Sequence, residues 1–551
     1  MTRLGMGAVA SLALLAAASG ALGQQPAAAP QAPALVEPGP AIPDWLSYGY
    51  DRQRTSWNRG ETTLTKQTVG RMKLLWSQKL LDKTPALVLS TLTAPVVVAG
   101  VATPQGSKDL LFTITMDDTL VSLDADSGAV VWKKHFDNPN KPLRPVSIAC
   151  SNTEQATPVI DKAKGVIYFT TSDGKLRAAA LADGAERMYP TQMVQPFSRN
   201  WSLNLVDDVV YTTAARGCGG SAGQPVENGT VAAVDVSDPQ HPQLSRFYTG
   251  KGRPAGPWGA TGVVWGPQGG YVTTADGPNE PGSGIYGDMV LAVRPKAYGL
   301  NDSFVPSHWH YVNMRDLDFG SGGPLLFPFG KRNIVVAASK ESVIYILDAA
   351  NLGGENHMTP LYQSPRFGND IQDFQAQGVW GSMATWENGK DRWLYVPMWG
   401  PPARTGPTFA HANGPVTNGS IMAFRLVDSG MQLNLDPQWI SRDLDMASPP
   451  VVANGIVYVL QTAESTIQVP GPPGSHVRPP GWTQEKSAED RIITPHATMT
   501  LFALDGETGK QLWSSRKAMD GNTVHFTQPV VALGKVFTVD HAGHVWAFGL
   551  Q

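Results

Sequence analysis

The sequence contains little charge, little cysteine and only one long apolar segment. Charged residues make up 16% of the 551 residues, and 43 basic residues stand against 46 acidic ones, a net charge of −3. Charge-driven nucleic-acid binding needs a basic excess or patch, so this composition gives that class no support. The two cysteines, Cys150 and Cys218, form no Cys-x-x-Cys pair, which excludes a zinc ribbon, a cysteine-bound iron–sulfur cluster and a c-type haem site.

Turn-forming residues and tryptophan are abundant instead. The chain has 57 Gly, 44 Pro and 16 Trp, and 42% of its residues are hydrophobic. This hydrophobic fraction is enough to form a large core and is not typical of a disordered chain. Together with the many turn formers, it predicts an all-β protein with many short strands.

The one long apolar segment lies at the N-terminus and is typical of a secretory signal. Arg3 precedes an apolar run over 4–18, and Ala21-Leu22-Gly23 provides small residues for cleavage. We expect a signal peptide at 1–23, an exported protein that is periplasmic or secreted, and no membrane span after signal removal. The alternative is a membrane anchor, but the run is shorter than the ~20 residues that cross a bilayer.

Two further expectations follow from export. Residues 24–43 are rich in Gln, Pro and Ala and predict a tether, followed by one domain over 44–551. An oxidising compartment permits a disulfide between Cys150 and Cys218, which we expect to join neighbouring blades of the fold described next. The alternative is two buried free thiols.

One pattern recurs along the chain. Its clearest copies, residues 121–132 and 501–513, each contain an alternating strand, a tight Asp/Gly turn and a second strand ending in Trp. Weaker copies lie at 176–188, 231–248, 289–311, 343–362, 421–439 and 544–550. Pro-led strands such as Ala94-Pro95-Val96 precede many copies, giving eight units of about four strands and ~64 residues each. This pattern predicts an eight-bladed β-propeller.

The last unit is incomplete. It stops at Gln551 without its final strand and Trp, while residues 72–76 form an unassigned strand that ends in Trp76. We expect this strand to pair with the one ending at Phe548 and to close the ring, because closure removes an exposed sheet edge. The alternative is an open solenoid with capped ends.

The strand–Asp-x-x-Ser/Thr-Gly–strand–Trp repeat resembles the tryptophan-docking repeat of the pyrroloquinoline quinone (PQQ) family of eight-bladed propellers. The segment Trp45-Leu-Ser-Tyr-Gly49, with Asp51, Arg54 and Ser56 after it, is similar to the start of the quinoprotein alcohol dehydrogenases. In that family, PQQ lies on the axis between a Trp and a disulfide of adjacent cysteines. A divalent cation held by Glu and Asn polarises the reactive carbonyl, an Asp is the general base, and an Arg or Lys binds the quinone oxygens.

The resemblance implies a base and a cation for the quinone. Asp316 and Asp318 match the family segment that carries paired Asp residues, with Arg315 as an adjacent positive charge. An ionised Asp at this point would take the substrate's hydroxyl proton, whereas the alternative is that both residues cap a turn. Lys340 matches the cation that offsets charge on the reduced quinone, and its alternative is a solvated loop residue.

The resemblance also implies aromatic contacts. Trp258, in Pro-Trp-Gly, matches the Trp on which the quinone stacks, and the alternative is a core Trp. Trp380 lies in another cluster at a blade start, where blades converge on the axial channel.

The metal site departs from the family pattern. Gln224 stands where the family has its Glu, and a neutral amide is a weaker ligand for a hard cation. Asp276 or Asn279 matches the Asn region. Adjacent cysteines are absent from the sequence, so the upper face of a quinone would need another cover.

Two functions stay open at this point. The first is a PQQ-type oxidoreductase that uses PQQ and a divalent cation such as calcium, oxidises a small alcohol, sugar or polyol, and passes electrons to a separate acceptor. The second is a non-catalytic propeller that serves as a binding or assembly scaffold. The Gln224 substitution favours the second.

Overall fold

The computed structural model describes residues 34–37, 41–84, 91–147, 150–215, 217–372, 377–430, 432–464, 480–481, 483, 486, 497–523 and 526–551. The chain divides into two units, Met1–Ala34 and Leu35–Gln551, and the elements described below belong to the second. The predicted signal peptide and most of the predicted tether lie outside the described residues. The boundaries at 23 and 43 stay predictions.

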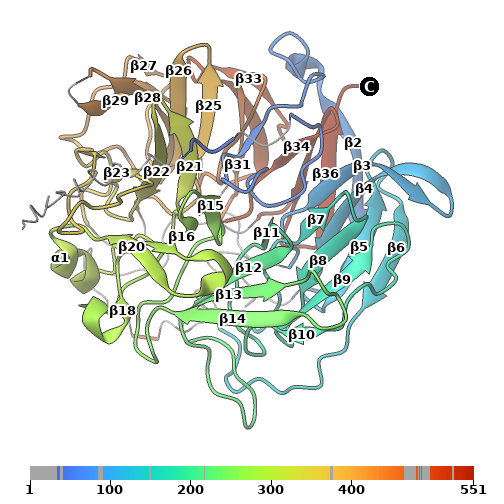
Figure 1. Cartoon of the computed structure of the whole chain (residues 1–551). Coiled ribbons are helices and arrows are strands. Elements are labelled where there is room, and N and C mark those ends of the chain that lie inside the picture. Colours follow the sequence, from blue (N-terminus) through green and yellow to red (C-terminus); the bar gives the residue numbers. More distant parts are fainter. Residues whose placement is uncertain are drawn as a thin grey trace, which may run out of the picture. The chain divides into compact units, whose positions relative to one another are not determined.

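The second unit contains eight antiparallel four-stranded sheets, here called blades 1 to 8 (Figure 1). Blades 1 and 2 are β3 (Val96–Thr103), β4 (Gly106–Ile114), β5 (Thr119–Asp124), β6 (Val130–His135); β7 (Val159–Asp161), β8 (Val166–Thr170), β9 (Lys175–Ala180), β10 (Thr191–Gln192). Blades 3 and 4 are β11 (Asn204–Val206), β12 (Val209–Ala214), β13 (Thr230–Asp235), β14 (Gln243–Tyr248); β15 (Val264–Gly266), β16 (Gly269–Thr273), β19 (Val290–Val293), β20 (Leu300–Phe304). Blades 5 and 6 are β21 (Leu325–Phe329), β22 (Arg332–Ala338), β23 (Ile344–Asp348), β24 (Tyr362–Gln363); β25 (Ala384–Asn388), β26 (Asp391–Trp399), β28 (Gly419–Asp428), β29 (Leu433–Ile440). Blades 7 and 8 are β30 (Val451–Ala453), β31 (Ile456–Gln461), β32 (Thr500–Asp505), β33 (Gln511–Ser514); β34 (Val530–Ala532), β35 (Lys535–Val539), β36 (His544–Gly549), β2 (Lys73–Lys79).

The remaining elements are short. β1 (Trp57–Asn58) and β27 (His411–Ala412) add a parallel strand to blades 7 and 6, and β17 (Asn279–Glu280) pairs with β18 (Ile285–Tyr286). The helices are α1 (Trp309–Met314) and the 3-10 turns η1 (Val69–Arg71), η2 (Pro281–Ser283) and η3 (Pro295–Ala297). Over the described residues, no helix combines the length and the apolar character that crossing a membrane requires.

The predicted all-β, eight-bladed propeller is confirmed by this arrangement. The first strand of a blade is largely buried, as in β7 and β30, whereas a last strand such as β6 alternates between exposed and half-buried positions. The hydrophobic cores lie between neighbouring blades, where the faces of adjacent sheets pack. This packing explains why buried runs and alternating strands recur together in every unit.

The N-terminal strand completes the last blade. β2 pairs antiparallel with β36, with Leu74 opposite Phe548 and Trp76 opposite Ala547. Blade 8 is therefore built from both ends of the propeller, as the incomplete last repeat predicted. The pairing covers the sheet edge that β36 would otherwise expose.

In blades 1, 6, 7 and 8, the Trp of the repeat joins the blade to its successor. Trp132 on the outer strand of blade 1 donates from Nε1 to the Leu181 carbonyl of blade 2 at 2.9 Å, and Trp439 of blade 6 donates likewise to Gly506 of blade 7 at 2.9 Å. The repeat glycine lies under the ring: a Cβ on Gly184, whose φ is +74°, would come within 2.8 Å of Trp132. The Trp and Gly positions of the repeat thus share one packing role.

The segment 43–58 crosses the axis and hydrogen-bonds to every blade. The contacts join, for blades 1 to 8 in order, Trp45 with Val97, Leu46 with Ile160, Arg54 with Leu203, Arg52 with Trp265, Gln53 with Leu326, Thr55 with Thr385, Ser56 with Val452, and Pro43 with Leu533. Most of these bonds use backbone groups at the inner strands. The segment therefore satisfies polar groups that would otherwise face the axis unpaired.

Candidate functional site

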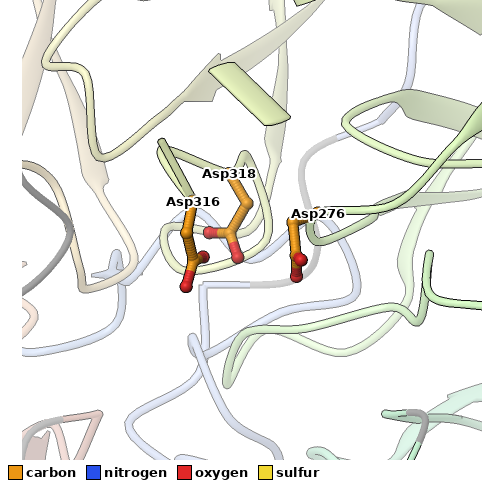
Figure 2. Close-up of side chains that lie close together, drawn as sticks. All are labelled: Asp276, Asp316 and Asp318. Atoms are coloured by element: carbon orange, nitrogen blue, oxygen red, sulfur yellow. The ribbon is translucent and has the colours of Figure 1, made fainter. Parts of the chain in front are cut away.

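Three acidic side chains converge at one end of the axis. Asp316 and Asp318 follow α1 on the connection from blade 4 to blade 5, and Asp276 lies in the β16–β17 connection of blade 4. One carboxylate oxygen from each lies within 4.8 Å of the other two, and Figure 2 shows Asp316 and Asp318 on one loop facing Asp276 on a second. Both residues lie on the irregular segment between α1 and β21, with Asp316 in a turn at φ +51° and Asp318 two residues beyond it.

Lys340 is the cation of this cluster. It lies in the β22–β23 turn of blade 5 and is 4% exposed, which excludes the reading as a solvated loop residue. Its Nζ is 3.0 Å from Asp316 Oδ1 and 3.4 Å from Asp318 Oδ1. The same Nζ lies 4.5 Å from the ring centroid of Trp380. The two Asp residues therefore do more than cap a turn, although Ser321 Oγ also donates to Asp318 Oδ1 at 3.1 Å.

Burial sets the protonation of these groups. Burial raises the pKa of Asp318 to about 7, while the ammonium of Lys340 acts in the opposite direction. Burial alone would lower the pKa of Lys340, but the carboxylates of Asp316 and Asp318 outweigh it and the pKa is raised. Lys340 is therefore charged, and Asp318 changes protonation near neutral pH.

A fourth carboxyl group lies behind the three. Asp288 is 0% exposed, and burial followed by the nearby charge of Asp318 raises its pKa well above the usual range. Its Oδ2 accepts a hydrogen bond from Asn313 Nδ2 at 3.1 Å, whereas Oδ1 has no partner among the described residues. In the sequence, Asp288 stands in no motif and only follows a glycine, so sequence analysis missed it. In the structure its φ is +54°.

An aromatic and guanidinium stack lies next to the cluster. Trp258 packs beside Gly320, on the segment that carries Asp318, because a Cβ on Gly320 would lie 2.4 Å from the Trp258 side chain. The Arg199 guanidinium lies 3.9 Å from the Trp258 ring centroid and 5.0 Å from that of Trp201. Sequence reasoning proposed Trp258 but missed Arg199 and Trp201, which precede β11 in no recognisable motif.

Trp201 also borders a pocket on the axis. This pocket holds about 40 Å³ and is lined by Tyr48 of the crossing segment, Gln155, Trp201 and Phe526, among others. The indole Nε1 atoms of Trp201 and Trp258 are buried without a hydrogen-bond partner among the described residues. Unsatisfied buried donors are uncommon in proteins and indicate an acceptor that a ligand or water supplies.

The other predicted site residues either lie further from the cluster or already contact other side chains of the protein. Trp380 stacks on Trp399 at 5.0 Å and 7°, and Lys340 Nζ lies 4.5 Å from its ring centroid. The Arg315 guanidinium lies 5.8 Å from the ring centroid of Tyr311 on its own helix. Gln224 lies in an exposed turn of the β12–β13 connection, and Asn279 begins the β17–β18 hairpin three residues beyond Asp276.

Cys150 and Cys218 form a disulfide with a Cα–Cα distance of 5.2 Å. Cys150 lies in the connection between blades 1 and 2, and Cys218 lies in the β12–β13 connection of blade 3. The bridge therefore joins the connection that enters blade 2 to blade 3. The alternative prediction, that the two cysteines are buried free thiols, is therefore wrong.

Comparison with known proteins identifies the architecture. Residues 45–209 match the family model described as the β-propeller domain of PQQ-dependent glucose, ethanol and alcohol dehydrogenases. The resemblance to the PQQ propeller family is confirmed. No curated protein is similar enough in sequence to count as a match.

Solved structures with a similar fold cover most of the chain. A quinohemoprotein alcohol dehydrogenase from Pseudomonas putida is 14% identical with a TM-score of 0.56, covering 94% of this chain and 82% of the other. The corresponding enzyme from Comamonas testosteroni is 14% identical with a TM-score of 0.55, at 93% and 81% coverage. A europium-containing methanol dehydrogenase is 13% identical with a TM-score of 0.56, at 92% and 98% coverage. At these identities the matches establish the fold, and function has to be argued from the site.

Proposed function

We propose that this chain is an exported PQQ-dependent oxidoreductase that oxidises a small alcohol, sugar or polyol and passes the electrons to a separate acceptor. The observation that carries the proposal is the convergence of Asp276, Asp316, Asp318 and Lys340 at the axis. These residues come from three separate segments of two blades. No blade packing requires them to meet, which favours a chemical role.

The acidic cluster fits a hard cation. Carboxylate oxygens are the ligands that Ca²⁺ and similar ions prefer, and Asp276, Asp316 and Asp318 provide three groups within 4.8 Å. Lys340 balances one of three negative charges, so two remain for a bound divalent ion. Asp276, one of the two residues that the family resemblance implies for the Asn position, would supply a carboxylate in place of the one missing at the exposed Gln224. The europium in the similar methanol dehydrogenase indicates that trivalent ions are worth testing at this site.

The surroundings fit a planar, acceptor-rich cofactor in part. Trp201 and Trp258 carry buried indole donors without partners among the described residues, and Arg199 supplies a buried positive charge beside both rings. Bound PQQ would accept the two electrons of the oxidation. The pocket of about 40 Å³ is smaller than the ~300 Å³ that ligand sites usually provide. Binding would therefore require a lining side chain such as Phe526 to move.

The chain's own residues have distinct roles in this proposal. Asp318, with its pKa of about 7, accepts the hydroxyl proton of the substrate at a carboxylate oxygen. Lys340 stays protonated and donates from Nζ to oxygen atoms that gain negative charge. Trp258 and Arg199 hold the planar group in place and exclude water.

A non-catalytic scaffold is the second candidate. It is favoured by the small axial pocket and by Lys340, which already satisfies two carboxylates without an added cation. Export remains part of both proposals and is supported by Arg3 and the apolar run over 4–18, which lie outside the described residues.

The test combines binding and turnover. Purified protein is titrated with PQQ in the presence of Ca²⁺ or Eu³⁺, and quenching of tryptophan fluorescence is followed before dye-linked oxidation of alcohols and sugars is measured. We expect quinone binding only with the cation, and we expect Asp318→Asn to lower turnover by at least ~100-fold while PQQ still binds. Asp183→Asn, in the exposed turn after β9, is the matched control. Failure to bind PQQ under both conditions would favour the scaffold.

A further inference from the structure

Helix α1 (Trp309–Met314) leads directly into the acidic cluster. Asp316 follows its last residue by two positions, and Asp318 by four. The helix has only six residues, too few to be stable without contacts elsewhere. Its contacts to neighbouring segments therefore decide where the two carboxylates lie.

On one side, α1 holds the loop that carries Asp276. Asn313 Nδ2 donates to the carbonyl of Gly277 at 2.7 Å and to Asp288 Oδ2 at 3.1 Å. Gly277 follows Asp276, and the backbone amide of Asp288 donates to the Ala275 carbonyl at 3.1 Å, so both ends of the loop are tied to the helix. The Asp276–Asp316 separation thus depends on Asn313.

On the other side, the start of α1 is held next to Lys340. His308 Nε2 lies 2.8 Å from Oε2 of Glu341, which follows Lys340 and is 4% exposed. Glu341 Oε1 accepts a second hydrogen bond at 2.9 Å from Arg366, on the connection from blade 5 to blade 6. Tyr311 OH donates to Gln372 Oε1 on the same connection.

We propose that α1 is a clamp for the cation site, and that Asn313 and Glu341 are the positioning residues that set the spacing of Asp276, Asp316, Asp318 and Lys340. The inference rests on the proposed function, because it presumes that the three carboxylates bind a cation. Carboxylates held this close repel one another until the cation arrives. A rigid support outside the ligands lowers the cost of bringing them together, and outer contacts of this kind change metal affinity by about 10–100-fold.

The clamp responds to pH through His308. Within the described part of the chain, two charged groups face its ring: Glu341 from the β22–β23 turn and Arg366 from the blade 5–6 connection. The hydrogen bond to Glu341 raises the pKa of His308, so the ion pair is complete below that pKa and loses its charge as the pH rises through it. Glu341 stays ionised, since its bond to His308 lowers its pKa despite burial.

The experiment measures ion binding and needs neither quinone nor turnover. Eu³⁺ is titrated into the full chain at pH 6, and its luminescence, excited through nearby tryptophans, gives the Kd and the number of bound waters. We expect Asn313→Ala and Glu341→Gln each to raise the Kd by about 10–100-fold and to add bound water. Asn301→Ala, which removes an exposed Asn–Gln hydrogen bond, and His241→Gln, which removes an exposed His–Asp pair, are the controls and should leave the Kd unchanged.

A second series separates positioning from mere stability. The deficit of His308→Gln should be about tenfold at pH 6 and should shrink below threefold at pH 9, where the wild-type pair has lost its charge. Lower apo thermal stability with an unchanged Kd would overturn the clamp, and so would a His308→Gln deficit independent of pH. If the wild-type chain binds no Eu³⁺, the cation site itself is wrong, and the proposed function falls together with the inference.

Discussion

The crossing segment and the acidic end of the axis differ in how their buried charged groups are paired. Along residues 43–58, the buried charge of Arg54 pairs with backbone: the residue is 1% exposed and donates to the carbonyls of Tyr48, Thr261 and Leu203. Among the described residues, Trp45 Nε1 and Gln53 Nε2 of this segment have no hydrogen-bond partner. At the acidic end, Asp276, Asp316 and Asp318 gather around the ammonium of Lys340, and among the described residues Asp288 and Trp258 keep unpartnered atoms. A buried charge that is fully paired with backbone is expected where the task is stability, whereas an excess of buried carboxyl groups over positive charge fits a site that a ligand completes.

The largest effect is expected in the crossing segment. Arg54→Ala should lower the free energy of unfolding by about 3–5 kcal/mol, because three buried carbonyls lose their charged donor. Calorimetry of the full chain provides the measurement, and Arg404→Ala, at an exposed ion pair with Asp370, is the control. Equal effects for the two variants would show that the hydrogen bonds of Arg54 do not stabilise the ring.

A smaller effect, reversible by cations, is expected at the acidic end. Lys340→Met should cost about 2–4 kcal/mol, because it leaves the carboxylates of Asp316 and Asp318 without their partner. Saturating Ca²⁺ or Eu³⁺ should restore much of this loss, since ~100-fold excess over Kd contributes about 2.7 kcal/mol. The same ions should not rescue Arg54→Ala. Thermal melts with and without the ions test this, and equal rescue of both variants would remove the contrast between the two regions.

The smallest effect is expected at a buried carboxyl group that accepts backbone hydrogen bonds, as in the crossing segment, but has a raised pKa, as at the acidic end. Glu154 is buried near the axial pocket, and its Oε1 accepts from the backbone amides of Gln155 and Ala156. Burial nevertheless raises its pKa to about 7, above the usual 4.5. The folded state therefore binds this proton more tightly than the unfolded state, and stability is lost as the pH rises from about 4.5 to 7.

Glu154→Gln removes that loss. The variant should match the wild type at pH 4.5 and should be more stable by about 1–3 kcal/mol at pH 8. Denaturant unfolding at both pH values measures the difference, with Glu355→Gln at an exposed position as control. A variant that is less stable at pH 8 would mean that the ionised carboxylate is itself needed by the fold.

Much of the fold was accessible from the sequence because its signals are local. In the two clearest copies the Asp/Gly turn and the terminal Trp lie within 13 residues, and the recurrence of this hairpin along the chain gave the blade count. The unpaired last repeat at Gln551 pointed to Trp76 as the closing strand, and β2 indeed pairs with β36. The site was accessible only as a set of candidates. Asp316, Asp318, Lys340 and Asp276 meet, whereas Gln224 and Arg315 lie elsewhere.

The sequence by itself determined the all-β class, the eight blades and the closing strand, because each follows from hairpin periodicity or turn chemistry. It left the cysteines open between a disulfide and two free thiols, which the structure decided. Tertiary structure decided which charges meet. Asn313 reaches the loop of Asp276, and Arg199 covers Trp258, through side chains on irregular connections between blades. Such contacts depend on how each blade turns relative to the next and on where the loops end. Neither is encoded in the spacing of residues along the chain, so the electrostatics of the site emerge only when the ring is closed.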